Sequence, residues 1–342
     1  MDNSAVSPQG VEGFSTGFPQ ANSVSLASIL RGMLVRSWLL GIGLWLSCIG
    51  AVSAAPSVLF TLQERSLLDE RGNIVLSPVL DFVTQVRGDQ FRNPPIPSET
   101  EYNIFAQNYF KNRPYSVWRL GQPLGSLTAL IPEKIPSLYG SLEAPIKTEQ
   151  SLLPLSDLDL VLVSDQPLKE IAHKPIAVEV LSSVDDLAKA AFEKAGLPAK
   201  VSAGVPRIWV GSAVVPGKPD AVVALYRKVF SAKQNGATVR QIVNLLLVAE
   251  SVTDKGQTTW QPRLNQISLG SPQNATQYGP LAIADVNGDG NEEIVVRETH
   301  FERWTYSIYG TSQGQWQSRY SGLEGNYGKE LPSVEDEETS AP

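Results

Sequence analysis

Short alternating runs of apolar and polar residues dominate the chain from residue 206 onward. Alternation with a period of two is typical of strands that bury one face. Asn235-Gly236 separates two of these runs and is a strong signal for a tight β-hairpin. This half of the chain is therefore predicted to be an antiparallel β module. Its expected strands lie at 207–215, 220–230, 237–251, 258–269, 281–286, 292–299, 304–310 and 314–322.

Residues 181–200, LSSVDDLAKAAFEKAGLPAK, follow a helical spacing instead. Ser183 is placed to cap the first turn, and Asp185 and Asp186 would then face the positive end of the helix dipole. Gly196 ends the pattern. The Asp pair also suits a metal or acid–base site, but capping accounts for it more simply. We expect this helix to flank the β module.

Residues 56–176 show a less regular pattern, which predicts a helix near 100–110, a hairpin over 115–131 and a strand within 153–164. We therefore expect an α+β protein, with a small mixed N-terminal domain and a C-terminal, mainly antiparallel β module with a flanking helix. The expected divisions are a leader at 1–55, the mixed domain at 56–176, the β module at 177–325 and an acidic, disordered tail at 326–342.

The N-terminal segment has the features of an export signal. Arg31 and Arg36 precede an apolar stretch at 38–52, and Val52-Ser53-Ala54 fits a small-residue cleavage site. We expect cleavage and export to a periplasmic or extracellular compartment. The alternative is a membrane anchor at 37–54 that is not cleaved.

Composition narrows the chemistry that the chain can perform. The 342 residues carry a net charge of −7 without an evident Lys/Arg cluster, which argues against a nucleic-acid partner. The single cysteine, Cys48, lies in the leader, so the exported part would contain neither a disulfide nor a thiol nucleophile. The two histidines, His173 and His300, stand in no catalytic or zinc motif. The expected partner is an unidentified protein or glycan, with a membrane contacted only through an uncleaved anchor.

The stretch 283–298, IADVNGDGNEEIVVRE, alternates oxygen-bearing with small residues before a β-branched run. Calcium binds oxygen ligands, and a calcium loop spaces them at alternate positions. Positions one, three, five, seven and nine of such a loop would be Asp285, Asn287, Asp289, Asn291 and Glu293. Gly290 takes the sixth position, where the chain must turn sharply. The twelfth position is Val296, so no carboxylate closes the loop as in an EF-hand.

Residues 281–298 resemble the calcium loop of FG-GAP and VCBS-type repeats, as found in the propeller of integrin α-chains. In those repeats one strand runs into the loop and a second runs out. The resemblance implies one calcium ion bound by side chains of Asp285, Asn287, Asp289 and Glu293 and by the carbonyl of Asn291. A degenerate copy lies at 213–227, where Pro216, Lys218 and Pro219 replace acidic ligands, so we expect that copy to bind no metal.

A second pair of segments supports an internal duplication. VAESVTDKGQTTWQPRL and YSIYGTSQGQWQSRY each run from a strand through a Gly-containing turn to a tryptophan, Trp260 or Trp316. Two copies predict two blade-like antiparallel units, which are too few to close a propeller. The simpler alternative is that two unrelated β-meanders align by chance.

The loop also admits an interpretation without metal, as a hairpin turn held by Asx hydrogen bonds. The carboxylates of Asp285, Asp289 and Glu293 favour the metal, because like charges at short range disfavour joint ionisation. Without a bidentate closing glutamate, the affinity is expected to be modest, about 10⁻⁵ to 10⁻³ M. The expected role is structural, to hold the two flanking strands in register.

Aromatic residues gather after the loop, and Trp304 and Tyr306 alternate with Ile308 on one face of a strand. This face suits a protein core better than a sugar-stacking platform. We therefore expect an exported, non-enzymatic protein with a structural calcium-binding β module and a binding or envelope-associated role. The alternative is a secreted, polysaccharide-directed hydrolase, which a pocket with two convergent carboxylates near this strand would favour.

Overall fold

The computed structural model describes most of the chain between Pro56 and Asn326. The described residues are 56–68, 73–96, 98–119, 121–132, 142–148, 161–169, 175–301 and 303–326. The predicted leader with Cys48, the residue His173 and the acidic tail beyond Asn326 lie outside them. No helix among the described residues is both long and apolar enough to cross a lipid bilayer.

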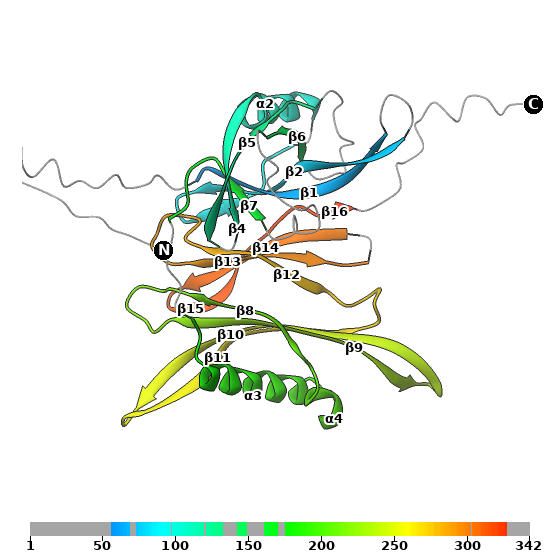
Figure 1. Ribbon diagram of the computed structural model, residues 1–342, viewed down its shortest axis with the longest axis vertical. Coiled ribbons are helices and arrows are strands. Elements are labelled where there is room, and N and C mark those ends of the chain that lie inside the picture. The colour runs from blue at the N-terminus through cyan, green and yellow to red at the C-terminus, as the bar shows by residue number, and fades with distance from the viewer. Residues whose placement is uncertain are drawn as a thin grey trace, which may run out of the picture. The chain divides into compact units, whose positions relative to one another are not determined.

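The first half of the chain forms a closed antiparallel barrel (Figure 1). Its strands are β1 (Val58–Leu68), β2 (Ile74–Arg87), β3 (Gln90–Arg92), β4 (Arg113–Arg119), β5 (Gln122–Ala129), β6 (Glu143–Lys147) and β7 (Val161–Ser164). The strand order is β1-β7-β4-β5-β6-β2-β3, and an additional pairing of β1 with β2 closes the ring and leaves β3 outside it. The predicted hairpin over 115–131 is confirmed as β4–β5.

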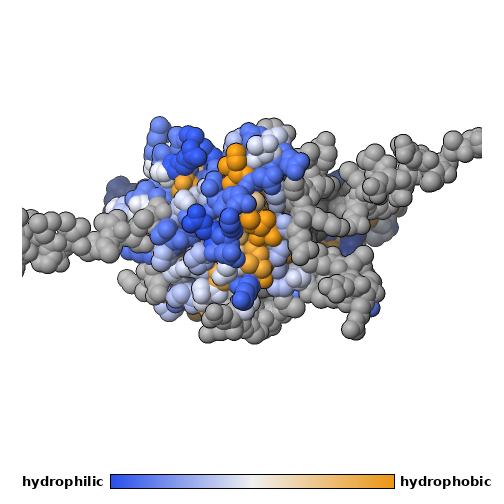
Figure 2. Space-filling model, turned by 90° about the horizontal axis from the view of Figure 1, so that it is seen from above, coloured by the Kyte–Doolittle hydropathy of each residue, from blue (hydrophilic) through white to orange (hydrophobic). Residues whose placement is uncertain are grey.

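Helix α2 (Glu99–Tyr109) packs against the barrel core. Ser98 caps it, because the Ser98 hydroxyl accepts a hydrogen bond from the Glu101 N–H at 3.3 Å. Tyr102 and Phe105 on its inner face are buried in the same cluster as the barrel strands. Ile104 points away and is 57% exposed. The face seen from above shows a strip of apolar side chains between hydrophilic ones (Figure 2).

The second half contains two four-stranded antiparallel meanders in which each strand pairs with the next along the chain. The first meander consists of β8 (Arg207–Ala213), β9 (Ala221–Gln234), β10 (Ala237–Asp254) and β11 (Gln257–Gly270). The second consists of β12 (Gln277–Ala284), β13 (Glu293–Thr299), β14 (Arg303–Ser312) and β15 (Gln315–Ser321), with the short β16 (Gly325–Asn326) paired to β14. The predicted antiparallel β module is confirmed, and the described chain is mainly β.

Apolar side chains pack these elements into layers. One cluster lies between the two meanders and includes Leu225 and Leu246 from the first and Ile294 and Trp316 from the second. A separate cluster joins the opposite face of the second meander to the barrel. The first meander is covered on its outer face by α3 (Val178–Lys194), with α4 (Ala199–Ser202) beside it (Figure 1). The second meander is therefore buried on both faces.

The tight turns of the two meanders follow local sequence. Asn235-Gly236 joins β9 to β10 with φ of 51° and 81°, which confirms the predicted hairpin. Lys255-Gly256 joins β10 to β11, and Gln313-Gly314 joins β14 to β15, with the same pair of positive φ angles. The last turn of each meander thus has the same backbone form. The two units match in strand order and in this turn, while a common origin of the two stays a prediction.

A buried carboxylate fastens the barrel to the second meander. Asp81 of β2 is fully buried, and its Oδ2 accepts hydrogen bonds from Trp304 Nε1 at 3.0 Å, from the Tyr306 hydroxyl and from the Gln63 amide. Burial and the Asp81 carboxylate raise the pKa of Tyr306 well above its ordinary value, so the hydroxyl stays a donor. Trp304, Tyr306 and Ile308 are thus core residues, as the alternation predicts.

Helix α3 begins earlier than predicted. Its first residue is Val178 and its N-cap is Ala177, so Ser183 lies inside the helix and donates its hydroxyl hydrogen bond to the Glu179 carbonyl at 3.0 Å. The predicted capping role of Ser183 is wrong, because the preceding residues 178–181 also adopt helical backbone. The helix ends at Lys194, before Gly196, as expected.

Candidate metal centre at the β12–β13 turn

The calcium-like stretch forms the turn between β12 and β13. Asp285 follows the last residue of β12, and its carboxylate accepts hydrogen bonds from the N–H of Gly288 at 2.7 Å and of Gly290 at 2.9 Å. Both glycines have positive φ, 77° and 88°, which lets the chain wrap around that carboxylate. Burial raises the pKa of Asp285, while the N–H bonds from Gly290 and Gly288 lower it in part.

The middle of the turn is held by its own amides. Asp289 Oδ1 accepts from the Asn291 N–H at 2.7 Å and from its side-chain amide at 2.9 Å. Asn287 Oδ1 accepts from the Asp289 N–H at 3.0 Å, and the Asn287 amide donates to Asp289 Oδ2 at 3.0 Å. These are the Asx hydrogen bonds that the interpretation without metal requires. An ionised carboxylate offers about four lone-pair sites, so such bonds leave room for a cation.

Glu293, the first residue of β13, is the most unusual member of the turn. Its side chain is fully buried, and Oε2 accepts from the Val286 N–H at 3.2 Å. Oε1 has no hydrogen-bond partner within the described residues. Burial raises the pKa of Glu293 to about 8, and the neighbouring carboxylates of Asp289 and Asp285 add to the rise. A buried carboxylate that lacks a partner for one oxygen and has two acidic neighbours is costly unless a cation or proton accompanies it.

Glu292 ties the turn to the first meander. It is 1% exposed, its Oε2 accepts from the Val214 N–H at 2.6 Å, and its own N–H donates to the Val214 carbonyl at 3.0 Å. Burial raises the pKa of Glu292 to about 7. The sequence pattern placed Glu292 in a strand and did not indicate this contact, because Val214 lies 78 residues earlier in the chain.

The five predicted ligands differ in their surroundings. Asn287 and Glu293 are buried, Asp285 and Asn291 are half-buried, and Asp289 is exposed. Within the described part of the chain, no three Asp, Glu, His or Cys side chains are arranged as a group that could hold a metal ion. Calcium binding by this turn therefore stays a prediction, and its ligands would have to draw together around the ion.

The degenerate copy lies directly beside this turn. The residues between β8 and β9 include Pro216, and a Cβ placed on Gly290 would lie 3.7 Å from its Cγ. Lys218 of the same segment donates from Nζ to the Gly314 carbonyl at 2.6 Å and lies 3.6 Å from Glu250 Oε1. The first turn thus carries its own cation, bonded to the β14–β15 turn.

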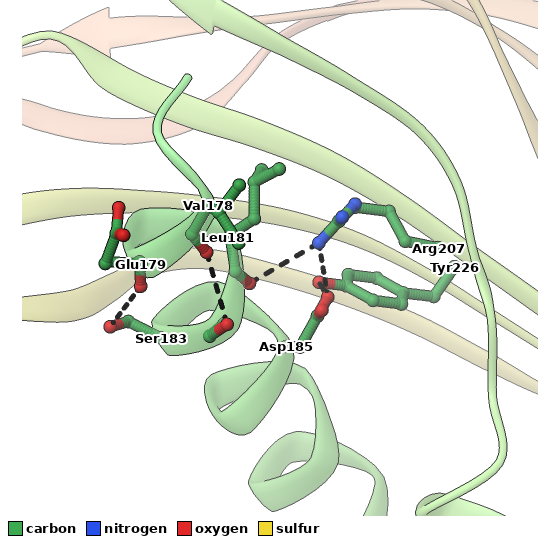
Figure 3. Close-up of polar contacts among 8 residues, drawn as sticks. Val178, Glu179, Leu181, Ser183, Asp185, Arg207 and Tyr226 are labelled. Carbon is green, nitrogen blue, oxygen red and sulfur yellow. Dashed lines mark hydrogen bonds and ion pairs between the residues drawn. The ribbon is translucent and has the colours of Figure 1, made fainter.

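A second polar cluster lies on the outer side of the first meander. Asp185 of α3 accepts hydrogen bonds from Arg207 Nη1 at 2.6 Å and from the Tyr226 hydroxyl at 2.7 Å (Figure 3). These residues line a cavity of about 440 Å³, with Asp186 and Lys189 at its edge. The predicted role of the Asp pair at the helix N-terminus is wrong, because the helix starts two turns earlier. Asp185 instead joins α3 to β8 and β9.

The remaining histidine that the structure describes stands at the end of β13. His300 Nδ1 lies 3.4 Å from the Thr276 hydroxyl. It lines an open cavity of about 490 Å³ with Gln273, Asn274, Phe301 and Arg303. Among the described residues, no carboxylate belongs to that lining.

Comparison with known proteins gives this chain no relative. Neither a protein-family model, nor a curated protein sequence, nor a solved structure matches it.

Proposed function

We propose that this protein is an exported, non-catalytic β scaffold whose β12–β13 turn binds one structural calcium ion. The ion would take side-chain oxygens from Asp285, Asn287, Asp289 and Glu293 and the carbonyl oxygen of Asn291. The scaffold would act in binding or in organising the cell envelope. The proposed export and the proposed calcium binding both rest on the sequence pattern. The geometry of the β12–β13 turn also supports the calcium binding.

The observation that carries the proposal is the buried carboxylate of Glu293. Its Oε1 lacks a hydrogen-bond partner within the described residues, and burial, with the acidic neighbours Asp289 and Asp285, raises its pKa. A divalent cation at this point would remove the repulsion and supply the missing partner for Oε1. Without a cation or a proton, burial of the Glu293 carboxylate beside Asp285 and Asp289 is unfavourable.

Calcium at this turn would stabilise more than one hairpin. Glu292 lies next to Glu293 and is bonded to Val214 at the end of β8. A fixed β12–β13 turn therefore also fixes where the two meanders meet. This suits a structural ion in a compartment where calcium is abundant.

The hydrolase alternative has less support. The aromatic strand face that would have served as a sugar platform is buried, with Trp304 1% and Tyr306 2% exposed. Among the described residues that line the cavity around His300 and Phe301, none is a carboxylate.

The test is thermal unfolding of the purified chain in a chelator and in calcium at about 100 times the dissociation constant. Binding to the folded state alone would then add about 2.7 kcal/mol. For a chain of this size that is a rise in Tm of roughly 4 to 5 °C. An unchanged Tm at calcium of up to about 100 mM, 100 times the weakest expected dissociation constant, would defeat the proposal.

The matched variants are Asp289→Asn and Asp186→Asn. Asp289→Asn keeps an acceptor oxygen for the turn but removes a ligand charge, so the calcium-dependent rise should largely disappear. Asp186 is an exposed carboxylate on α3, remote in sequence from the turn, so Asp186→Asn should leave the rise intact. Isothermal titration with calcium gives the stoichiometry, which should be one.

A further inference from the structure

The β9–β10 hairpin extends beyond its neighbours as a two-stranded arm (Figure 1, right). Strand β8 pairs with β9 only as far as Tyr226, and β11 pairs with β10 only from Ile242 onward. Residues 230–241 therefore pair only with one another. An isolated two-stranded ribbon buries little surface and is marginally stable by itself. A projecting ribbon of this kind is suited to contact with a partner.

The arm and its base are basic in an acidic protein. Residues 227–241 contain Arg227 and Lys228 at the base and Lys233 and Arg240 in the arm, and no Asp or Glu, while the whole chain has a net charge of −7. Arg227 is used inside the fold, because it donates to Asn244 and to the Tyr278 carbonyl. Lys233 and Arg240 are exposed and form no ion pair with any described residue.

The register places these two free cations on one face of the arm. Lys233 is opposite Thr238, and Arg240 is opposite Ser231, two residues nearer the base. Partners across a rung share a face, and so do alternate residues along a strand. The same face continues at the base with Val229, which is 43% exposed. Lys233 and Arg240 are thus separated by about 7 Å along the ribbon, and the apolar Val229 follows on the same face toward the base.

The open cavity around His300 lies at the base of this face. Val229 pairs with Ile242, and Ile242 pairs with Gly270 of β11. A Cβ on Gly270 would lie 3.5 Å from the Cβ of Asn274, which lines the cavity. The base of the arm and the cavity are therefore linked by Val229, Ile242 and Gly270, which lie side by side on three neighbouring strands.

The cavity offers donors and acceptors for hydroxyl groups around an exposed ring. Phe301 is 60% exposed, and the amides of Gln273 and Asn274 stand beside it. Arg303 adds a cation whose ion pair with Glu324 uses only Nη1. An aromatic face with amide side chains suits the apolar side and the hydroxyls of a sugar ring.

We propose that the arm and this cavity together bind an acidic polysaccharide, one that carries about one carboxylate or sulfate per sugar. The Phe301 cavity would hold one sugar ring, and Arg240 and Lys233 would meet the charges of the following rings. Charge density favours this partner over duplex DNA. Duplex DNA carries one charge per about 1.7 Å of helix axis, and binding to it depends on neutralising many phosphates, for which this face offers two free cations.

A lipid surface fits the arm less well than a glycan. The tip of the arm, Asn235-Gly236, is flanked by Gln234 and Ala237, so it presents no large apolar side chain for insertion. Val229, the exposed apolar residue of this face, lies at the base instead. The chemistry of the base, with an aromatic ring among amides, is also that of a sugar site.

The experiment is binding of the purified chain to polygalacturonate and to its fully methyl-esterified form, in chelator so that calcium does not enter. The charged polymer should bind, and the neutral polymer, which has the same backbone, should bind at least tenfold more weakly. Affinity for the charged polymer should fall steeply between about 50 and about 200 mM salt, as for other polyanions. Equal affinity for both polymers would overturn the proposal.

The variants separate charge from stacking. Lys233→Gln combined with Arg240→Gln should weaken binding roughly tenfold, since exposed ion pairs contribute up to about 1 kcal/mol each. Phe301→Ala should weaken binding of the polymer and leave its salt dependence unchanged. Lys111→Gln with Lys147→Gln, two exposed cations on the barrel side, removes the same charge and should leave binding unchanged.

Two further ligands decide between classes of partner. A DNA duplex and vesicles of anionic phosphatidylglycerol are titrated under the same conditions. Tighter binding of either one than of polygalacturonate would overturn the glycan proposal in favour of that partner. An unchanged affinity of the Lys233→Gln, Arg240→Gln variant, with the wild-type melting temperature, would equally contradict it.

Discussion

The first turns of the two meanders stand side by side and are built on opposite principles. The turn between β8 and β9 contains Lys218, whose ammonium donates to Gly314 and lies near Glu250. The turn between β12 and β13 contains Asp285, Asp289 and the adjacent Glu293, but neither lysine nor arginine. One turn supplies its own cation, and the other gathers negative charge around a buried carboxylate.

The difference shows what a buried charge requires. Asp81, elsewhere in the protein, is as buried as Glu293, but its Oδ2 receives hydrogen bonds from Trp304 and Tyr306. Glu293 receives one hydrogen bond, from the Val286 N–H, and burial together with two acidic neighbours raises its pKa. Three neutral donors from within the protein hold one oxygen of the Asp81 carboxylate. Glu293 has fewer donors and two acidic neighbours, so an external cation would stabilise its charged form.

The largest effect is expected where the two turns meet. Glu292→Ala would leave the Val214 N–H without its side-chain acceptor in a buried site, which should cost about 3 kcal/mol of unfolding free energy. Glu292→Gln retains an acceptor and should cost about a third of that. Urea denaturation in chelator measures both. A cost for Glu292→Ala no greater than for Glu292→Gln would show that this contact does not join the meanders.

Glycine substitutions compare the two backbones directly. Gly217 and Gly290 have φ of +77° and +88°, which disfavour any side chain. Gly217→Ala and Gly290→Ala should each cost about 1 to 2 kcal/mol in chelator. Calcium should increase the cost only for Gly290→Ala, because only that turn would lose a ligand arrangement. A calcium-dependent cost for Gly217→Ala would contradict the assignment of a metal to the second turn alone.

Removing the internal cation should have the smallest effect. Lys218→Met would lose one charged hydrogen bond at a partly exposed site, at a cost of up to about 1 kcal/mol. Because Lys218 belongs to the turn that is expected to bind no metal, Lys218→Met should lower the unfolding free energy equally in calcium and in chelator. Lys189→Met, an exposed lysine on α3, serves as the control and should cost less. If calcium changed the cost of Lys218→Met, the two turns would not be independent.

Local features of the fold were predictable, because they depend on neighbouring residues. Period-two alternation indicated all eight strands of the two meanders, and Asn235-Gly236 fixed one turn by its backbone preference. The barrel was not predictable, since its ring includes the pairing of β1 with β7, about a hundred residues later in the chain. The start of α3 was misplaced for a related reason. Ser183 has the chemistry of a cap, but the helix continues for a further turn and more before it.

The candidate site shows the same division. The sequence located the turn and named Asp285 and Glu293, because their spacing is local. It did not indicate that Glu293 would be fully buried, nor that Glu292 would bond Val214 across 78 residues. The pairing of Asp185 with Arg207 and Tyr226 was missed likewise, because helix and strands meet only in the folded chain.

The most direct test of the central claim is the melting temperature of Glu293→Gln beside the wild type, each in chelator and in saturating calcium. In chelator the variant should differ by less than about 1 kcal/mol, because a neutral side chain of the same shape avoids the repulsion from Asp289 and Asp285. In calcium the wild type should gain about 2.7 kcal/mol and the variant almost none. Equal calcium stabilisation of both proteins, or of neither, would contradict the account.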